Sequence, residues 1–160
     1  MKKQQSGFTM IELIMVIVIL GILAAFALPK FADFGSDARV ATLNGALGAV
    51  KSAAGIAHAQ QLVDAGAKNA SVTLEGATVT MVNGYPTAND AGILVAADLS
   101  DEFSSTGGGA TAGTALTIQI KGAPTPASCS FTYTVPTATG TAPNLVYPTP
   151  TYGVVVTSGC

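Results

Sequence analysis

Charged side chains are scarce in this sequence. Only 10% of its 160 residues are Asp, Glu, Lys or Arg, whereas an ordinary soluble domain carries about 25%. Because 49% of the chain is hydrophobic, the composition excludes an intrinsically disordered chain, which needs low hydrophobicity and high charge. It also argues against a free cytosolic enzyme. The net charge of −2 gives no reason to expect a nucleic-acid-binding surface.

Cysteine and histidine are scarcer still, with two copies and one copy. The sequence has no Cys/His cluster for zinc and no haem-attachment spacing, so it predicts no metal site, no cofactor and no enzyme activity. His58 lies beside glutamines on an expected helix, which favours a solvated side chain. The glycines at 107–109 lack the Lys-Ser/Thr of a phosphate-binding loop. Asp98, Asp101 and Glu102 are expected to form a solvated acidic cluster, because calcium needs more ordered oxygen ligands.

One long apolar run contrasts with the scarcity of charge. Of the 21 residues from Phe8 to Leu28, 18 are apolar, and as a helix they would be about 31 Å long, close to the hydrocarbon thickness of a bilayer. Lys2 and Lys3 are the only charges before the run, which places this end in the cytoplasm. The run has no small-residue exit site like that of a secretory signal peptide. We therefore expect a membrane anchor, with the rest of the chain outside the cytoplasm.

A single carboxylate interrupts the anchor. Glu12 lies four residues after Phe8, about one helical turn inside the run, where a carboxylate costs roughly 2.5–3.5 kcal/mol on insertion scales. Two interpretations are open from the residues alone. Glu12 either snorkels to the cytoplasmic interface, or it has a cationic partner in an assembled state. The α-amine created by a cut just before Phe8 is a candidate for this cation.

The start of the chain resembles the type IV prepilin signature, which it carries as Gly7-Phe8-Thr9-Met10-Ile11-Glu12-Leu13 followed by an Ile/Val/Leu run. In that family a prepilin peptidase cuts after the glycine and N-methylates the new terminal phenylalanine. The resemblance implies a cut between Gly7 and Phe8 and methylation of Phe8. It also implies that Glu12 pairs with the Phe8 amine of a neighbouring subunit. A buried ion pair adds little net stability but can fix the register of its partners.

A single long helix is expected from Phe8 to about Val63. Pro29 lacks an N–H and is expected to kink this helix near Gly21, and it resembles the helix-kinking proline of the pilin family. Beyond Pro29, apolar residues recur three and four positions apart, as one face of a helix requires; they are Leu43, Leu47, Val50, Ala54 and Ala57. Such a helix would exceed the diameter of the domain, so its apolar half is expected to protrude into lipid or into a polymer.

The chain after Gly66 is rich in Thr, Gly, Ser, Val and Pro, and parts of it alternate apolar and polar residues, as half-buried antiparallel strands do. These parts are 116–120, 129–135 and 152–156, with 72–82 as a weaker fourth. We expect a short helix at 91–99 and loops at 104–113 and 136–150. The predicted fold is α+β: a long N-terminal helix packs through its C-terminal half on an antiparallel sheet. This is the pilin-like roll that the resemblance also implies.

The resemblance implies a cleaved leader at 1–7, a membrane-spanning and filament-core helix at 8–28, and a globular domain at 29–160 that is first periplasmic and then surface-exposed. Cys129 and Cys160 lie in the last part and should pair in an oxidising compartment; two unpaired thiols are the alternative. The bridge would close a loop of about 32 residues and add roughly 3–4 kcal/mol in the chain-entropy model. A C-terminal loop bounded by a disulfide is common in pilins.

Four short segments also resemble the mannose-sensitive haemagglutinin (MSHA) major pilins; they are 29–31, 37–39, 55–58 and 84–87. This resemblance implies the major structural subunit of a type IV pilus, a filament for adhesion and biofilm formation in a Gram-negative bacterium. The implied partners are other pilin copies, the prepilin peptidase, and an inner-membrane assembly platform with its ATPase motor. The precursor is expected in the inner membrane and the pilus (fimbrium) outside the cell. No motif assigns a surface receptor or glycan.

Two other functions are compatible with the sequence. A pseudopilin of a type II secretion system shares the N-terminal signature, although the C-terminal disulfide loop favours a surface pilin. The second alternative is a membrane-anchored binding module or enzyme that never polymerises. The position of Glu12 and the missing catalytic set argue against it.

Overall fold

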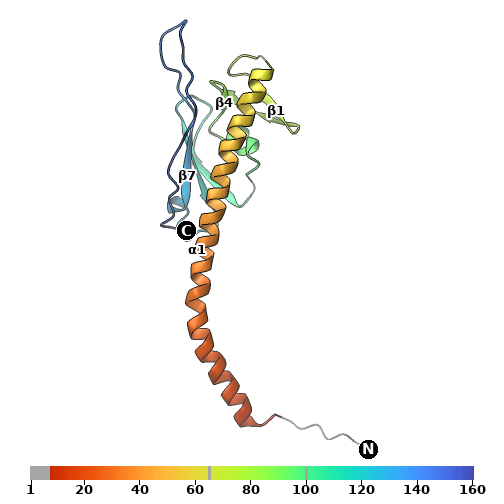
Figure 1. Cartoon of the computed structure of the whole chain (residues 1–160), viewed down its shortest axis with the longest axis vertical. Helices are drawn as coiled ribbons and strands as arrows, with labels where there is room; N and C mark the ends of the chain where they lie inside the picture. The colour runs from red at the N-terminus through yellow and green to blue at the C-terminus, as the bar shows by residue number, and fades with distance from the viewer. Residues whose placement is uncertain (1–7, 65, 100) are drawn as a thin grey trace, which may run out of the picture. The chain divides into compact units, whose positions relative to one another are not determined.

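The computed structural model describes residues 8–64, 66–99 and 101–160, and for 28–33 it describes the backbone alone (Figure 1). The chain divides into two compact units, with the boundary between Asp37 and Ala38. The division into a leader, a filament-core helix and a globular domain stays a prediction.

One helix, α1 (Met10–Val63), contributes to both units and contains 54 residues. It ends where the sequence predicts and begins two residues after the expected start. The helix continues through Gly21 and Pro29, and the kink expected there stays a prediction. In the first unit, Met10–Ala27 is long and apolar enough to cross a membrane, and none of it is buried. Among the described residues it is the single segment with these properties.

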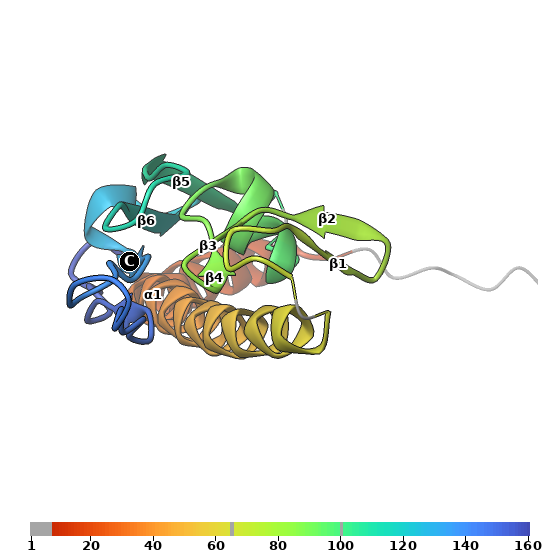
Figure 2. The same ribbon diagram turned by 90° about the horizontal axis from the view of Figure 1, so that it is seen from above.

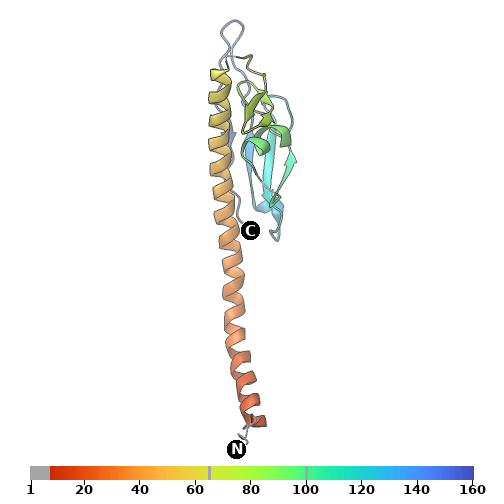
Figure 3. The same ribbon diagram turned by 90° about the vertical axis from the view of Figure 1, so that its right-hand side faces the viewer.

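In the second unit, the helix from Ala38 onward lies along one face of an antiparallel sheet (Figures 2 and 3). Leu43, Val50 and Ala54 are fully or almost fully buried, and they belong to one core cluster with Leu116 and Phe131 of the sheet. The other two residues of the predicted stripe, Leu47 and Ala57, are half-buried and buried. Most of the apolar stripe predicted from the sequence is therefore the face that packs on the sheet, while Ala57 packs in a second cluster with Val72, Val79 and Met81. The α+β fold is confirmed.

The main sheet has four strands in the order β5-β6-β7-β8, and every neighbouring pair is antiparallel. Its strands are β5 (Phe103–Gly107), β6 (Ala115–Ile120), β7 (Ser130–Thr134) and β8 (Thr151–Tyr152). The predictions for β6 and β7 are confirmed. The third predicted strand is shorter than expected, although Val156 still bridges to Ser130.

Strand β5 corrects the sequence-based expectation of a loop at 104–113. Its residues Phe-Ser-Ser-Thr-Gly show no apolar alternation, so the sequence alone favours a loop. The strand forms because its backbone pairs with β6 from Phe103↔Ile120 to Gly107↔Leu116. Pairing at the edge of a sheet depends on the neighbouring backbone, which a local pattern does not report.

Two small hairpins connect α1 to the main sheet. β1 (Val72–Leu74) pairs with β2 (Ala77–Val79), and β3 (Met81–Val82) pairs with β4 (Tyr85–Pro86). Both turns have two central residues with positive φ: Glu75 and Gly76 in the first, Asn83 and Gly84 in the second. Positive φ at both positions matches the twist of paired strands. The interruption in the weak fourth strand is therefore a turn.

Two short helical turns complete the second unit. The helix expected at 91–99 is a π-helical turn, η1 (Asp90–Leu94), followed by two α-helical residues. A 3₁₀ turn, η2 (Pro126–Ser128), stands between β6 and β7.

Candidate assembly site

Two residues at the start of α1, Thr9 and Glu12, hydrogen-bond to each other. Thr9 stands just before the first helical residue, Met10, and its hydroxyl oxygen accepts a hydrogen bond from the backbone N–H of Glu12 (3.3 Å). In return, the Glu12 carboxylate oxygen Oε2 accepts the Thr9 backbone N–H at 2.8 Å and the Thr9 hydroxyl at 2.7 Å. This reciprocal pattern is a capping box, which satisfies N–H groups that a helix start leaves unpaired.

Apolar side chains surround the carboxylate. Phe8, Ile11, Met15 and Val16 line a shallow hollow of about 470 Å³ together with Glu12. All four are exposed, and Phe8 is exposed to 88%. When lipid or another helix covers these side chains, the carboxylate loses water, and an unpaired charge there is costly. Charge-assisted hydrogen bonds from Thr9 replace part of that hydration.

The residues predicted for processing lie next to this capping box. Phe8 precedes it and is not helical, while Gly7, on the other side of the expected cut, lies outside the described residues. The cut, the methylation of Phe8 and the pairing of Glu12 with an amine stay predictions. Thr9 is the residue that sequence reasoning misses. Its signal is the pattern Thr-x-x-Glu before an apolar run, the sequence form of a capping box.

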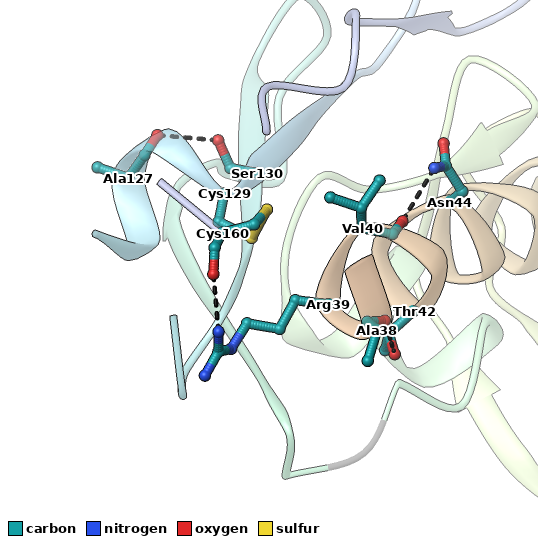
Figure 4. Close-up of a disulfide and its surroundings, with 9 residues drawn as sticks. All are labelled: Ala38, Arg39, Val40, Thr42, Asn44, Ala127, Cys129, Ser130 and Cys160. Atoms are coloured by element: carbon teal, nitrogen blue, oxygen red, sulfur yellow. Dashed lines mark hydrogen bonds between the residues drawn. A yellow bond between two sulfur atoms is a disulfide. The ribbon is translucent and has the colours of Figure 1, made fainter. Parts of the chain in front are cut away.

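The second predicted feature is a disulfide between Cys129 and Cys160, and the structure contains it (Figure 4). Both cysteines are buried, with 0% and 7% of their surface exposed. Arg39 on α1 donates a hydrogen bond from Nη1 to the carbonyl oxygen of Cys160 at 2.8 Å (Figure 4). The disulfide and Arg39 together fasten residue 160 to the sheet and to the helix.

His58 is only partly solvated, whereas the sequence favours a solvated side chain. Its ring is half-buried and stacks on Tyr85, with centroids 4.4 Å apart and an interplanar angle of 9°. Its Nδ1 lies 2.7 Å from the carbonyl oxygen of Gly84. Because a carbonyl oxygen only accepts, Nδ1 carries the hydrogen of this bond. A local sequence pattern does not predict this contact, because His58 and Gly84 become neighbours only when the turn between β3 and β4 packs on the helix.

A cluster of tyrosines lies beside this contact. The buried Tyr133 hydroxyl donates to the carbonyl oxygen of Pro86 at 2.8 Å, and its ring centroid is 5.8 Å from that of Tyr152. The Lys51 ammonium lies 5.5 Å from the Tyr152 ring centroid. Burial raises the pKa values of Tyr133, Tyr85 and Tyr152 above the usual range of tyrosine. These hydroxyls therefore keep their protons further into the alkaline range than an exposed tyrosine does.

The acidic cluster is exposed, as the sequence predicts. Asp98, Asp101 and Glu102 all lie at the surface, and the first two line a hollow of about 430 Å³ with Asp90 and Lys121. In the described parts of the chain, no three His, Cys, Asp or Glu side chains are grouped so that they could hold a metal ion.

The geometry defines a class of protein: an apolar N-terminal helix with a capped carboxylate precedes an α+β domain that contains a disulfide. Comparison with known families agrees with this description. The prokaryotic N-terminal methylation motif matches residues 2–28. No solved structure matches the chain.

The relatives are proteins of filaments and of a secretion system. The chain is 49% identical over 55 residues to the type IV narrow pilus major component PilA5 of Thermus thermophilus, covering 34% of this chain and 47% of the relative. It is 51% identical over 49 residues to the type IV major alpha-pilin of Moraxella bovis, covering 31% of each. It is 44% identical over 52 residues to the type II secretion system core protein G of Pseudomonas aeruginosa, covering 32% and 37%.

The chain therefore matches about a third to a half of the length of these relatives. The motif and these relatives show that part of the chain is similar to type IV pilins and to a type II secretion system core protein. The finer resemblance to the MSHA pilins is not confirmed by these matches.

Proposed function

We propose that the chain is the major structural subunit of a type IV pilus and polymerises through its N-terminal helix into a surface filament. The observation that carries this proposal is the apolar segment Met10–Ala27, none of which is buried, with the Glu12 carboxylate at its start. An apolar surface of this extent needs a partner. Lipid is the partner before assembly, and the same segment of other copies is the partner afterwards.

Processing is proposed at the Gly7–Phe8 bond. A prepilin peptidase removes residues 1–7 and methylates the new amine of Phe8, within the region that matches the methylation motif. Removal of the leader takes away Lys2 and Lys3, so five of the seven basic side chains remain. The Phe8 amine of one subunit then pairs with Glu12 of a neighbour, because a carboxylate covered by apolar helices needs a cation.

The proposed location follows from this processing. The precursor lies in the inner membrane of a Gram-negative bacterium, where an assembly platform and its ATPase motor extract it into the filament. The MSHA-like segments of the sequence favour a pilus for adhesion and biofilm formation. Non-closing contacts between identical subunits are what produce a filament rather than a ring.

A pseudopilin of a type II secretion system is the second candidate. The observation that favours it is the similarity to the core protein G of Pseudomonas aeruginosa, which covers 32% of this chain, against 31% for the alpha-pilin of Moraxella bovis. The buried disulfide favours the pilus, because a covalent cross-link stabilises a domain that is exposed outside the cell in a filament. A membrane-anchored module that never polymerises is the remaining alternative.

Shearing separates these candidates. Cells that produce the full chain together with a pilus assembly system are sheared, and the released material and the membranes are analysed by intact mass. We expect abundant released subunit that begins at methylated Phe8. Subunit found in the membrane fraction alone would refute the pilus, and short periplasmic filaments that depend on a secretion system would support the pseudopilin.

A further inference from the structure

We propose that Thr9 is a positioning residue for assembly, which holds one oxygen of the Glu12 carboxylate and leaves the other for a cation of a second subunit. This inference rests on the proposed function and adds a residue to its assembly step. The observation behind it is that the hydrogen bonds from Thr9 at the start of α1 end on one oxygen of the Glu12 carboxylate, Oε2.

All the hydrogen bonds that the carboxylate accepts within the described residues end on one oxygen. Oε2 accepts the backbone N–H of Thr9 at 2.8 Å and its hydroxyl at 2.7 Å. Oε1 accepts none from residues 8–64, 66–99 or 101–160. An ionised carboxylate has about four acceptor positions, so the carboxylate retains capacity for an ammonium donor while Thr9 stays bound.

The capping box also limits the conformations of the glutamate side chain. A free glutamate has several flexible torsions and loses rotamer freedom when a partner immobilises it. Thr9 fixes those torsions within the subunit, before any neighbour arrives. The pairing step therefore loses less conformational entropy, which is how preorganisation increases affinity.

The same bonds matter before assembly. Glu12 shares its hollow with Phe8, Ile11, Met15 and Val16, and these side chains offer the carboxylate no hydrogen bond. The Thr9 amide and hydroxyl supply two donors from the same chain. A carboxylate with internal donors is less costly in apolar surroundings than an unpaired one. The Thr9 donors therefore lower the cost of the Glu12 charge in the precursor, before a cation of a second subunit pairs with it.

The test uses the full chain and two matched changes at position 9. Thr9→Ser keeps the hydroxyl and both of its hydrogen bonds. Thr9→Val keeps the shape of threonine but removes the hydroxyl, so Oε2 loses one donor and the Glu12 N–H loses its acceptor. Each variant is produced together with an epitope-tagged copy of the unmodified chain in cells that assemble pili.

The measured quantity is the ratio of variant to unmodified subunit in sheared filaments, divided by the same ratio in membranes. We expect Thr9→Val to lower this quantity by about fivefold or more, since it removes a hydrogen bond to a charged group. We expect Thr9→Ser to stay within about twofold of the unmodified chain, because serine forms the same capping box. An unchanged value for Thr9→Val overturns the inference.

A double variant separates positioning from simple helix capping. Glutamine at position 12 can still close a capping box, but it carries no charge to pair with an amine. If Thr9 acts through the carboxylate, Thr9→Val has little further effect in a Glu12→Gln background, because the two changes remove the same interaction. An equal fold-loss in both backgrounds means that Thr9 is a cap alone, which overturns the inference.

Two further readouts make the remaining outcomes decisive. Intact mass reports whether the Thr9→Val chain is cut before Phe8 and methylated. A variant that stays uncut would mean that the hydroxyl acts at the peptidase step, which overturns the inference.

Cells with the unmodified chain alone serve as the reference. If they release no filament, the proposed function fails, whereas released filament with normal Thr9→Val incorporation refutes the role of Thr9 alone.

Discussion

Arg39 and Cys160 are joined by a hydrogen bond although 121 positions separate them in the chain. The Arg39 guanidinium, on the part of α1 that belongs to the second unit, donates to the Cys160 carbonyl oxygen at 2.8 Å. Cys160 is also bonded to Cys129, which directly precedes β7. One residue is thereby held by the helix through a hydrogen bond and by the sheet through a covalent bond.

Replacing Arg39 by glutamine should destabilise the second unit. The Cys160 carbonyl loses a charged donor, and hydrogen bonds to charged groups contribute about 1.5–3 kcal/mol. We expect the free energy of unfolding to fall by roughly 1–2 kcal/mol, because Arg39 is half-buried and water replaces part of the bond. Urea unfolding of the detergent-solubilised full chain measures the change.

Lys121→Gln is the control for Arg39, since it removes one positive charge from an exposed position outside α1. It should change the free energy of unfolding by less than about 0.5 kcal/mol. Equal effects of the two changes would show that net charge matters and the bond to Cys160 does not.

Reduction of the disulfide should have a larger effect. The bridge joins residues 31 positions apart, and the chain-entropy model assigns such a loop about 3–4 kcal/mol. We expect the urea midpoint of the full chain to fall strongly after reduction, and Cys129→Ala with Cys160→Ala to reproduce this fall. A reduced chain with an unchanged midpoint would contradict the prediction; mass spectrometry of alkylated thiols verifies that reduction was complete.

The helix and the inner strands were predictable from local patterns. Leu43, Val50 and Ala54 recur at helical spacing, and Leu116, Ile118 and Ile120 alternate, because in each case one face is buried. Strand β5 has no such pattern, since its small polar residues are placed by pairing with β6 and not by an apolar face.

The site was predictable where the residues form a motif. Glu12 and the cysteines could be found in the sequence, and so could Thr9, because Thr-x-x-Glu before an apolar run is a local pattern. Arg39 and His58 could not be found in this way. Their partners, Cys160 and Gly84, are distant in the sequence and become neighbours only after the helix packs on the sheet.

The buried Tyr133 hydroxyl should make stability depend on pH in the alkaline range. Burial raises the pKa of Tyr133 in the folded chain, whereas an unfolded tyrosine titrates near pH 10. Above about pH 10 the unfolded chain therefore binds fewer protons than the folded chain, and the free energy of unfolding falls as pH rises. The contribution is fully present below the unfolded pKa.

Tyr133→Phe tests this assignment at two pH values. Near pH 7 it should cost about 1–2 kcal/mol, because the Pro86 carbonyl loses its donor in a buried position. Between pH 9 and 11, a range set around the reference value of about 10 for tyrosine, the variant should lose less stability than the unmodified chain. Urea unfolding across this range provides the measurement, with Tyr147→Phe as a control at a less buried tyrosine. Parallel pH curves for Tyr133→Phe and the unmodified chain would refute the assignment.

Three glycines on α1 should be replaceable by alanine with a gain in stability. Gly45, Gly48 and Gly55 are exposed in the helix, and a Cβ built at any of them meets no atom within 4 Å apart from its chain neighbours and the adjoining helix backbone. Alanine is favoured over glycine in a helix interior by about 1 kcal/mol, so each change should raise the free energy of unfolding of the full chain by up to that amount. Gly92→Ala is the control, because its Cβ would clash with Thr87, and it should destabilise the chain. A lower free energy of unfolding for Gly48→Ala would contradict the prediction and would mean that glycine is needed at this position for the stability of the subunit.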